Sequence, residues 1–176
     1  MVVSKGSTVA FKGDAVVNAA NEECLGGGGV DGAINRAGGE ALARARQNLP
    51  LLSVGVRCCT GSAVMTFGGA LEATTCVHAV GPNYCNYDGD LERADADLRS
   101  AYTAAMAIAQ KQGLTTVGFS LISAGIYRKP RSLDAVLEIG CEAIVDGGEL
   151  GQGREWDGCG AGCVWGGVFI GHSLLT

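Results

Sequence analysis

Short apolar runs recur along the chain, and each is bounded by polar or turn-forming residues. Such runs, rich in β-branched side chains, are typical of buried strands. Residues 15–19 (Ala-Val-Val-Asn-Ala) give the clearest example, and Gly81-Pro82-Asn83 ends another run. The predicted strands occupy residues 2–3, 15–19, 61–67, 75–80 and 115–121.

Between these runs, apolar residues recur at spacings of three and four, which predicts helices. The strongest pattern covers residues 91–109, and Gly113 is expected to end that helix. A first helix should begin near residue 30 or 31 and pause at 38–39, and Ser132 can cap a last helix. Strands that alternate with helices predict an α/β fold whose mixed, mostly parallel sheet is covered on both faces. In such sheets, ligands bind beyond the carboxyl ends of the strands.

Composition and charge narrow the function classes. The 176 residues are 47% hydrophobic and 18% charged, which is typical of one globular domain. The net charge of −5 argues against non-specific nucleic-acid binding, although backbone N–H groups can still hold a small anion. No apolar run reaches the roughly 18 residues of a membrane span, and the start lacks a secretory layout. We therefore expect a cytoplasmic, nuclear or organellar protein that acts as a monomer.

Metal and cofactor sites are not expected. The eight cysteines include no Cys-x-x-Cys pair, and the two histidines stand at no ligand-like spacing. Reduced, buried thiols are the better interpretation. We interpret His78 as a hydrogen-bonded core histidine rather than as a catalyst.

The last thirty or so residues differ from the rest. Residues 1–145 are predicted as the folded domain, and 146–176 as an atypical glycine-rich segment. That segment has no helical period and few strand formers. Residues 163–170 could supply one further strand.

The stretch after the predicted strand at 15–19 carries the chemistry. Asn18 and Asn21 are followed by four glycines at 26–29, and a helix is expected to start directly afterwards. Glycines let the backbone approach a ligand, and a helix N-terminus offers free N–H groups and a positive dipole. Together they suit a diphosphate. The stretch is not a P-loop, because no Lys follows the glycines. A bare glycine run would also fit a flexible surface loop.

A longer pattern surrounds the glycines. Asn18-Ala19-Ala20-Asn21 combined with residues 26–39 resembles the signature of the macrodomain family, and most closely its MacroD-type branch. The segments at 58–63, 78–84 and 122–130 are similar to further motifs of that family. The resemblance extends from about residue 5 to 144. It implies a three-layer α/β/α fold with an ADP-ribose cleft at one end of the sheet.

Two residues receive catalytic roles from the resemblance. Asn21 and Asp31 would act on the distal ribose of ADP-ribose. Ester hydrolysis needs a placed water, a group that orients the ribose hydroxyls and an oxygen that polarises the water. Asp31 would stay ionised in the first turn of its helix. Without the resemblance, the favoured interpretations are a turn residue for Asn21 and an ordinary helix-start carboxylate for Asp31.

The resemblance also implies the residues that hold the ligand. Tyr127 would pack against the distal ribose, although it could instead be a half-buried core aromatic. The other residues would hold the ribose and the diphosphate largely through their backbone. These are Gly27, Gly28, Gly29 and Val30 on one side, and Ser123, Ala124, Gly125 and Ile126 on the other.

The chain departs from the family pattern at two positions in this region. Ser7 stands where the family has an Asp that accepts a hydrogen bond from the adenine amine. A hydroxyl is a weaker acceptor than a carboxylate, so adenine selectivity should soften. Arg128 stands where the family has Gly. It would clash if the backbone there needs a positive φ, or it would add a cation near the diphosphate.

Three hypotheses about function follow from these residues. The first is hydrolysis of ADP-ribosyl esters, both mono-ADP-ribose on Asp or Glu of proteins and O-acetyl-ADP-ribose. The second is a reader module that binds ADP-ribose or ADP-ribosylated proteins without turnover. The third is a decayed protein that neither binds nor folds well. Asn21 and Asp31 favour the first, whereas Ser7 and Arg128 favour the second.

Overall fold

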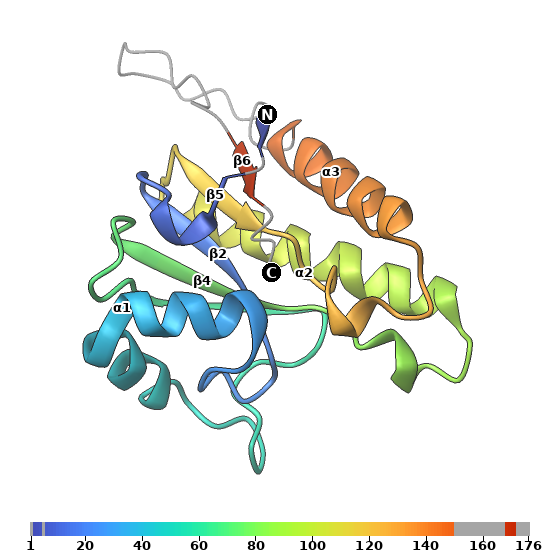
Figure 1. Ribbon diagram of the computed structural model, residues 1–176, viewed down its shortest axis with the longest axis horizontal. Coiled ribbons are helices and arrows are strands. Elements are labelled where there is room, and N and C mark those ends of the chain that lie inside the picture. Colours follow the sequence, from blue (N-terminus) through green and yellow to red (C-terminus); the bar gives the residue numbers. More distant parts are fainter. Residues whose placement is uncertain (1, 5, 150–167, 172–176) are drawn as a thin grey trace.

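The computed structural model describes residues 2–4, 6–149 and 168–171. The strands are β1 Val2–Ser4, β2 Ala15–Ala20, β3 Ala63–Phe67, β4 Thr75–Val80, β5 Val117–Ser120 and β6 Val168–Gly171. Over the described residues they form one six-stranded sheet in the order β1-β6-β5-β2-β4-β3 (Figure 1). All neighbouring strands are parallel except β3 and β4, which are antiparallel. The sheet is therefore mixed and mostly parallel, as predicted.

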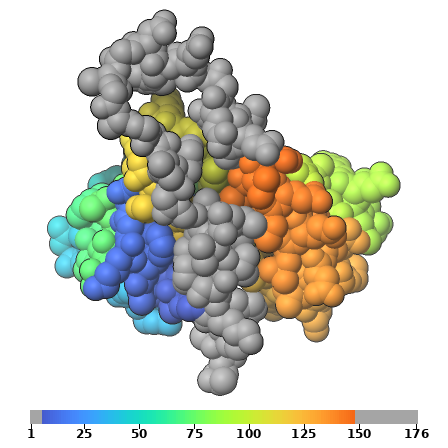
Figure 2. Space-filling view, turned by 90° about the horizontal axis from the view of Figure 1, so that it is seen from above, coloured from blue at the N-terminus to red at the C-terminus, as the bar shows by residue number. Residues whose placement is uncertain are grey.

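Helices cover both faces of this sheet. Helix α1, Gly29–Gln47, lies on one face, and α2, Leu91–Lys111, lies with α3, Leu133–Glu149, on the other (Figure 1). Figure 2 shows the same separation from above, with the N-terminal third in blue to green on one side and α3 in orange on the other. This arrangement confirms the predicted three-layer α/β/α fold.

Strand β2 supplies side chains to both layers. Val16 packs in a buried cluster with Ile34 and Leu42 of α1, whereas Ala15 and Val17 belong to the cluster under α2 and α3. Successive side chains of a strand point to opposite faces of the sheet. Asn18 therefore lies on the α1 face, where a buried polar side chain needs partners within the protein.

The helix ends confirm the local sequence signals. Helix α1 continues through the expected pause but is kinked at Gly39, which has φ 64° and ψ −162°. Gly113 follows α2 with φ 66°, as expected of a residue that ends a helix. Ser132 caps α3, because its Oγ accepts the N–H of Ala135 at 3.2 Å. None of the described helices is long and apolar enough to cross a membrane.

The end of the chain is more regular than predicted. Helix α3 extends to Glu149, although no helical period was recognised beyond 145. Packing against α2 accounts for the extra turn, because Gln110 Nε2 donates to the carbonyl of Gly147. The strand expected within 163–170 is present as β6, which pairs between β1 and β5. Residues 150–167 and 172–176 lie outside the described part of the chain, and the boundary at 145 stays a prediction.

Candidate functional site

The two predicted ligand loops meet at one edge of the sheet. Parallel strands end at the same edge, so the loop after β2 comes to face the loop after β5. Between them lies a cleft with a volume of about 420 Å³. Its lining comprises Ala19, Ala20, Asn21, Gly27, Gly28, Gly29, Val30, Asp31, Gly81, Leu121, Ile122, Ser123, Ala124, Gly125, Ile126 and Tyr127.

All the site residues predicted from the sequence line this cleft, except Ser7. Ser7 is exposed and precedes the short 3₁₀ helix Thr8–Ala10, and its side chain makes no capping hydrogen bond. Its neighbour Thr8 points inward, where its hydroxyl lies 3.1 Å from that of Ser120. A contact between Ser7 and adenine therefore stays a prediction.

Asn21 is both a turn residue and a cleft residue. Its Oδ1 accepts the N–H of Cys24 at 3.1 Å, and its Nδ2 donates to the carbonyl of Gly26 at 3.3 Å. These bonds close the turn that carries the chain from β2 into the glycine run. The side chain is half-buried at the cleft wall. The turn therefore fixes the amide at the cleft wall, so a structural role does not exclude the predicted ligand role.

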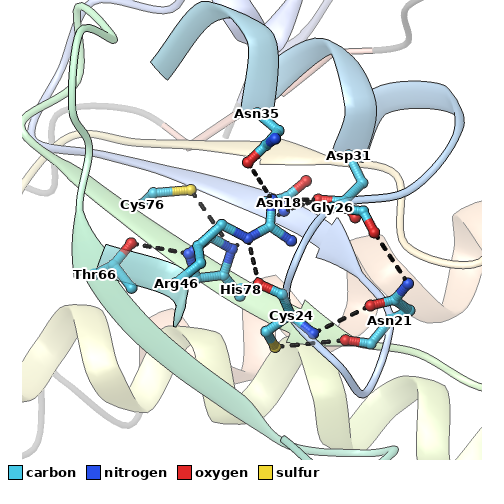
Figure 3. A network of polar contacts seen from close by, with 10 residues as sticks. All are labelled: Asn18, Asn21, Cys24, Gly26, Asp31, Asn35, Arg46, Thr66, Cys76 and His78. Atoms are coloured by element: carbon cyan, nitrogen blue, oxygen red, sulfur yellow. Dashed lines mark hydrogen bonds and ion pairs between the residues drawn. The ribbon is translucent and has the colours of Figure 1, made fainter. Parts of the chain in front are cut away.

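Asp31 belongs to a buried polar network beneath the first loop (Figure 3). Its Oδ1 accepts a hydrogen bond from Asn18 Nδ2 at 2.7 Å and lies 2.8 Å from Nη1 of Arg46. The Arg46 side chain is fully buried, and it also donates through Nε to the carbonyl of Cys24 and through Nη1 to Asn35 Oδ1. Asp31 is therefore not an ordinary helix-start carboxylate, because an internal cation balances its charge.

Arg46 is a residue of this network that was not predicted from the sequence. The signal that could have found it is the spacing of four residues that joins it to Gly38 and Leu42 on the buried face of α1. An Arg at such a position needs a buried anion, and Asp31 lies at the start of the same helix. The kink at Gly39 hides this relation, because it interrupts the regular helical spacing between them.

One carboxylate oxygen of Asp31 takes no part in the hydrogen bonds of this network. Oδ2 has no hydrogen-bond partner among the described residues, and neither has Nη2 of Arg46. A β-carbon built on Gly27 would lie 3.1 Å from this Oδ2 and 3.5 Å from Nδ2 of Asn21. The buried, unpartnered Oδ2 of Asp31 and the amide of Asn21 thus lie on the same side of Gly27. Such a pair can receive and donate hydrogen bonds to the hydroxyls of a sugar.

His78 supports this network from below. Its side chain is fully buried, and its ring nitrogens lie 3.2 Å from Asn18 Nδ2 and 2.9 Å from Thr66 Oγ1. Burial, together with the nearby Arg46 cation, lowers the pKa of His78 from 6.5 to about 3. The neutral ring accepts from Asn18 at Nδ1 and donates to Thr66 from Nε2, since an amide nitrogen can only donate. This agrees with a core histidine.

The second loop is fixed to its surroundings at both ends. Ser123 has φ 54°, and its Oγ donates to the carbonyl of Pro82 at 2.7 Å. Tyr127 is half-buried and contributes to the cleft wall. Arg128 has no positive φ, so the predicted clash does not arise. Its guanidinium donates to the carbonyls of Ala124 and Arg131, at 3.2 and 3.0 Å, and it is not among the described residues that line the cleft.

Metal-ligating side chains do not gather in this region. Within the described ranges, no group of three or more His, Cys, Asp or Glu residues could hold a metal ion. Six cysteines fall in these ranges and all are free thiols, whereas Cys159 and Cys163 lie outside them.

Comparison with known proteins identifies relatives that match most of this chain in sequence. The O-acetyl-ADP-ribose deacetylase of Escherichia fergusonii is 39% identical over 144 residues, which cover 82% of this chain and 77% of that protein. A macro domain-containing protein of Listeria monocytogenes is 41% identical over 135 residues, covering 77% and 74%.

Solved structures agree with these relatives. The Oceanobacillus iheyensis macrodomain with ADP has a TM-score of 0.77 at 27% identity, covering 96% of this chain and 80% of that one. The Trypanosoma brucei macrodomain in complex with ADP has a TM-score of 0.75 at 31% identity, covering 96% and 61%. The family described as Macro domain matches residues 17–137. The chain therefore belongs to the macrodomain family.

Proposed function

We propose that this protein binds ADP-ribose in the cleft and hydrolyses ADP-ribosyl esters. The substrates are O-acetyl-ADP-ribose and mono-ADP-ribose attached to Asp or Glu of proteins. One observation carries the proposal: the buried, unpartnered Oδ2 of Asp31 and the amide of Asn21 lie on the same side of Gly27, and all three residues line the cleft between the two loops.

Binding follows from the backbone of the two loops. The N-terminus of α1 at Gly29 opens on the cleft, and its free N–H groups and dipole favour a diphosphate. The second loop offers further backbone N–H groups from Ala124 to Tyr127 on the opposite wall. The distal ribose would then lie over Gly27, between Asn21 and Tyr127. The deacetylase name of the Escherichia fergusonii relative and the ADP in two macrodomain structures support this ligand.

Hydrolysis requires a water beside the ester on that ribose. Asn21 orients a ribose hydroxyl through its amide, and Oδ2 of Asp31 accepts a hydrogen bond from the hydroxyl or from the water. The water oxygen bonds to the acyl carbon, the bond from that carbon to the ribose oxygen breaks, and the ribose oxygen takes the proton. Arg46 and Asn18 hold Oδ1 of Asp31 and so set the direction of Oδ2.

The test compares Asn21→Ala and Asp31→Asn with the wild type. We expect each substitution to lower kcat by about 10²- to 10³-fold, because an oriented polar group contributes on this scale. Release of ADP-ribose from an automodified acceptor and of acetate from O-acetyl-ADP-ribose gives the rates. Glu138→Gln on α3, an exposed carboxylate outside the cleft lining, is the matched control. Equal rates in all four proteins would remove the catalytic assignment.

A reader module is the second candidate, and one observation favours it. Asp31 is only 4% exposed and its Oδ1 is held by Arg46, so its carboxylate has little freedom to activate a water. In that case Asp31 would only accept a hydrogen bond from the ribose. Calorimetry that finds ADP-ribose binding, together with no ADP-ribose release by the wild type, would select the reader function.

A further inference from the structure

A second pocket opens beside the cleft and is lined mainly by polar side chains. It has a volume of about 370 Å³ and shares Asn21, Gly81 and Tyr127 with the cleft. Its lining, here called the polar pocket, is Asn21, Glu22, Thr60, Val80, Gly81, Asn83, Asn86, Tyr87, Arg93 and Tyr127. The shared residues make the two hollows neighbours in the structure.

If the proposed function holds, the position of the polar pocket indicates which part of the substrate it contacts. Asn21 and Tyr127 are the residues proposed to flank the distal ribose, which carries the ester. The cleft on one side of these two residues would hold the nucleotide. The polar pocket on their other side then lies where the acyl partner of the ester must extend.

Arg93 is the one cationic side chain among the described residues that line the polar pocket. It stands in the first turns of α2 with its guanidinium over the Tyr87 ring, 5.9 Å from the ring centroid. Tyr87 is held in turn by its hydroxyl, which donates to Asp97 at 2.6 Å. Within the described part of the chain, Arg93 takes part in no ion pair. The guanidinium of Arg93 therefore lies against the Tyr87 ring, and no ion pair among the described residues engages its N–H donors.

The acidic side chain of the polar pocket is already engaged. Oε1 of Glu22 accepts both the N–H and the hydroxyl of Thr60, each at 3.0 Å. Asn83 uses Oδ1 to accept the N–H of Cys85 at 3.3 Å, which leaves its Nδ2 as a donor. Glu22 keeps its negative charge and its Oε2, so the donors that an anionic ligand could use are the guanidinium of Arg93 and Nδ2 of Asn83.

We propose that the polar pocket binds an acidic peptide segment next to the ADP-ribosylated residue of a protein substrate. Arg93 pairs with a carboxylate of that segment, and Asn83 donates to its backbone or side chain. This inference rests on the proposed function, and it names the preferred substrate class as protein esters with acidic neighbours. An acetyl ester brings only a methyl group and offers Arg93 no charge.

Two synthetic peptides carrying one ADP-ribosyl-glutamate test this, one flanked by Asp and Glu and the other by Ser and Gln. We expect the wild type to favour the acidic peptide by about tenfold in kcat/KM, the scale of one charge-assisted contact. The ratio should fall to about one in Arg93→Ala and below one in Arg93→Glu. Arg44→Ala, which removes an exposed helix Arg outside both hollows, should keep the ratio. A preserved ratio in Arg93→Ala overturns the proposal, even if both rates fall.

Binding separates this proposal from the proposed function. If the wild type hydrolyses neither peptide, the hydrolase assignment fails, and calorimetry with the intact peptides decides the role of the polar pocket. Tighter binding of the acidic peptide that is lost in Arg93→Ala supports the pocket as an acidic-peptide site. Equal affinities of the two peptides for the wild type overturn it. In both assays the preference should shrink as salt rises, because Arg93 is exposed.

Discussion

Arg46 and Asp31 form an ion pair in the protein interior, with side chains 0% and 6% exposed. Removing two charges from water is costly, and their attraction offsets this cost only when further hydrogen bonds satisfy them. Here Asn18, Asn35 and the carbonyl of Cys24 supply some of those bonds, whereas Oδ2 of Asp31 and Nη2 of Arg46 have no partner among the described residues. The clearer role of the pair is therefore to fix the position of the cleft residue Asp31, rather than to stabilise the fold.

Removal of one partner should be much worse than removal of both. Arg46→Met leaves the Asp31 carboxylate buried without its cation and should lower the free energy of unfolding by about 3–5 kcal/mol. In the double variant Arg46→Met/Asp31→Asn the buried charge is gone, so the loss should be smaller than in Arg46→Met alone. Urea unfolding of the wild type, both single variants and the double variant gives the coupling energy.

The outcome that contradicts this view is additivity. If the double variant loses the sum of the two single losses, the side chains do not interact as the structure places them. Arg44→Ala serves as the control, because it removes an exposed partner of Glu40 on the same helix. A surface pair of that kind contributes at most about 1 kcal/mol.

Two elements are brought into close contact at the centre of the site, where β4 ends beside the second loop. Gly81 follows β4 and lines both the cleft and the polar pocket. A β-carbon built on it would lie 2.3 Å from Cγ2 of Ile122 and 2.3 Å from Oγ of Ser123. The absent side chain at Gly81 therefore sets how closely the second loop approaches the end of β4.

Gly81→Ala should push the second loop outward. We expect the free energy of unfolding to fall by about 1–3 kcal/mol, as in other overpacked sites, and ADP-ribose binding to weaken. Urea unfolding and calorimetry measure the two effects. Gly28→Ala is the control for stability, because its backbone is extended and nothing lies within 4 Å of an added β-carbon. Equal stability of the two variants would contradict the close approach at Gly81.

The stability of the whole molecule should depend on pH through His78. Its pKa is about 3 in the folded protein, because burial disfavours the charged ring, and about 6.5 when unfolded. Between these values the unfolded chain binds one more proton. The contribution is therefore fully present above about pH 6.5 and is lost as the pH falls toward 3, by about 1.4 kcal/mol per pH unit.

Urea unfolding at about pH 7 and about pH 5.5 measures this loss, which should be about 1 kcal/mol for His78. His78→Gln should be less stable at both values but should lose little between them. Asp14 does not interfere, because hydrogen bonds from Thr115 and Thr116 lower its pKa to about 2 and it stays ionised across this range. An equal loss in the wild type and His78→Gln would show that His78 is not the titrating group.

Local signals in the sequence determined much of the fold and most of the cleft. Apolar spacing found the strands and helices, and Gly39, Gly113 and Ser132 were recognised because helix kinks and ends depend on neighbouring residues. The asparagines and glycines after β2 indicated one wall of the cleft, since a loop and the helix that follows it are adjacent in the chain. The opposite wall was indicated by the resemblance of residues 122–130 to a macrodomain motif.

Tertiary contacts alone decided the rest. The neutral His78 and the extra turn of α3 depend on packing between different elements. Arg46 and Asp31 share α1, but the kink at Gly39 interrupts the helical spacing between them, so only the folded chain shows that they pair. The same holds for Arg128, whose two sequence alternatives gave way to bonds with nearby carbonyls. The polar pocket joins residues from β4, α2 and four connecting loops. Sequence spacing predicts which residues share an element, whereas burial and charge balance depend on which elements meet.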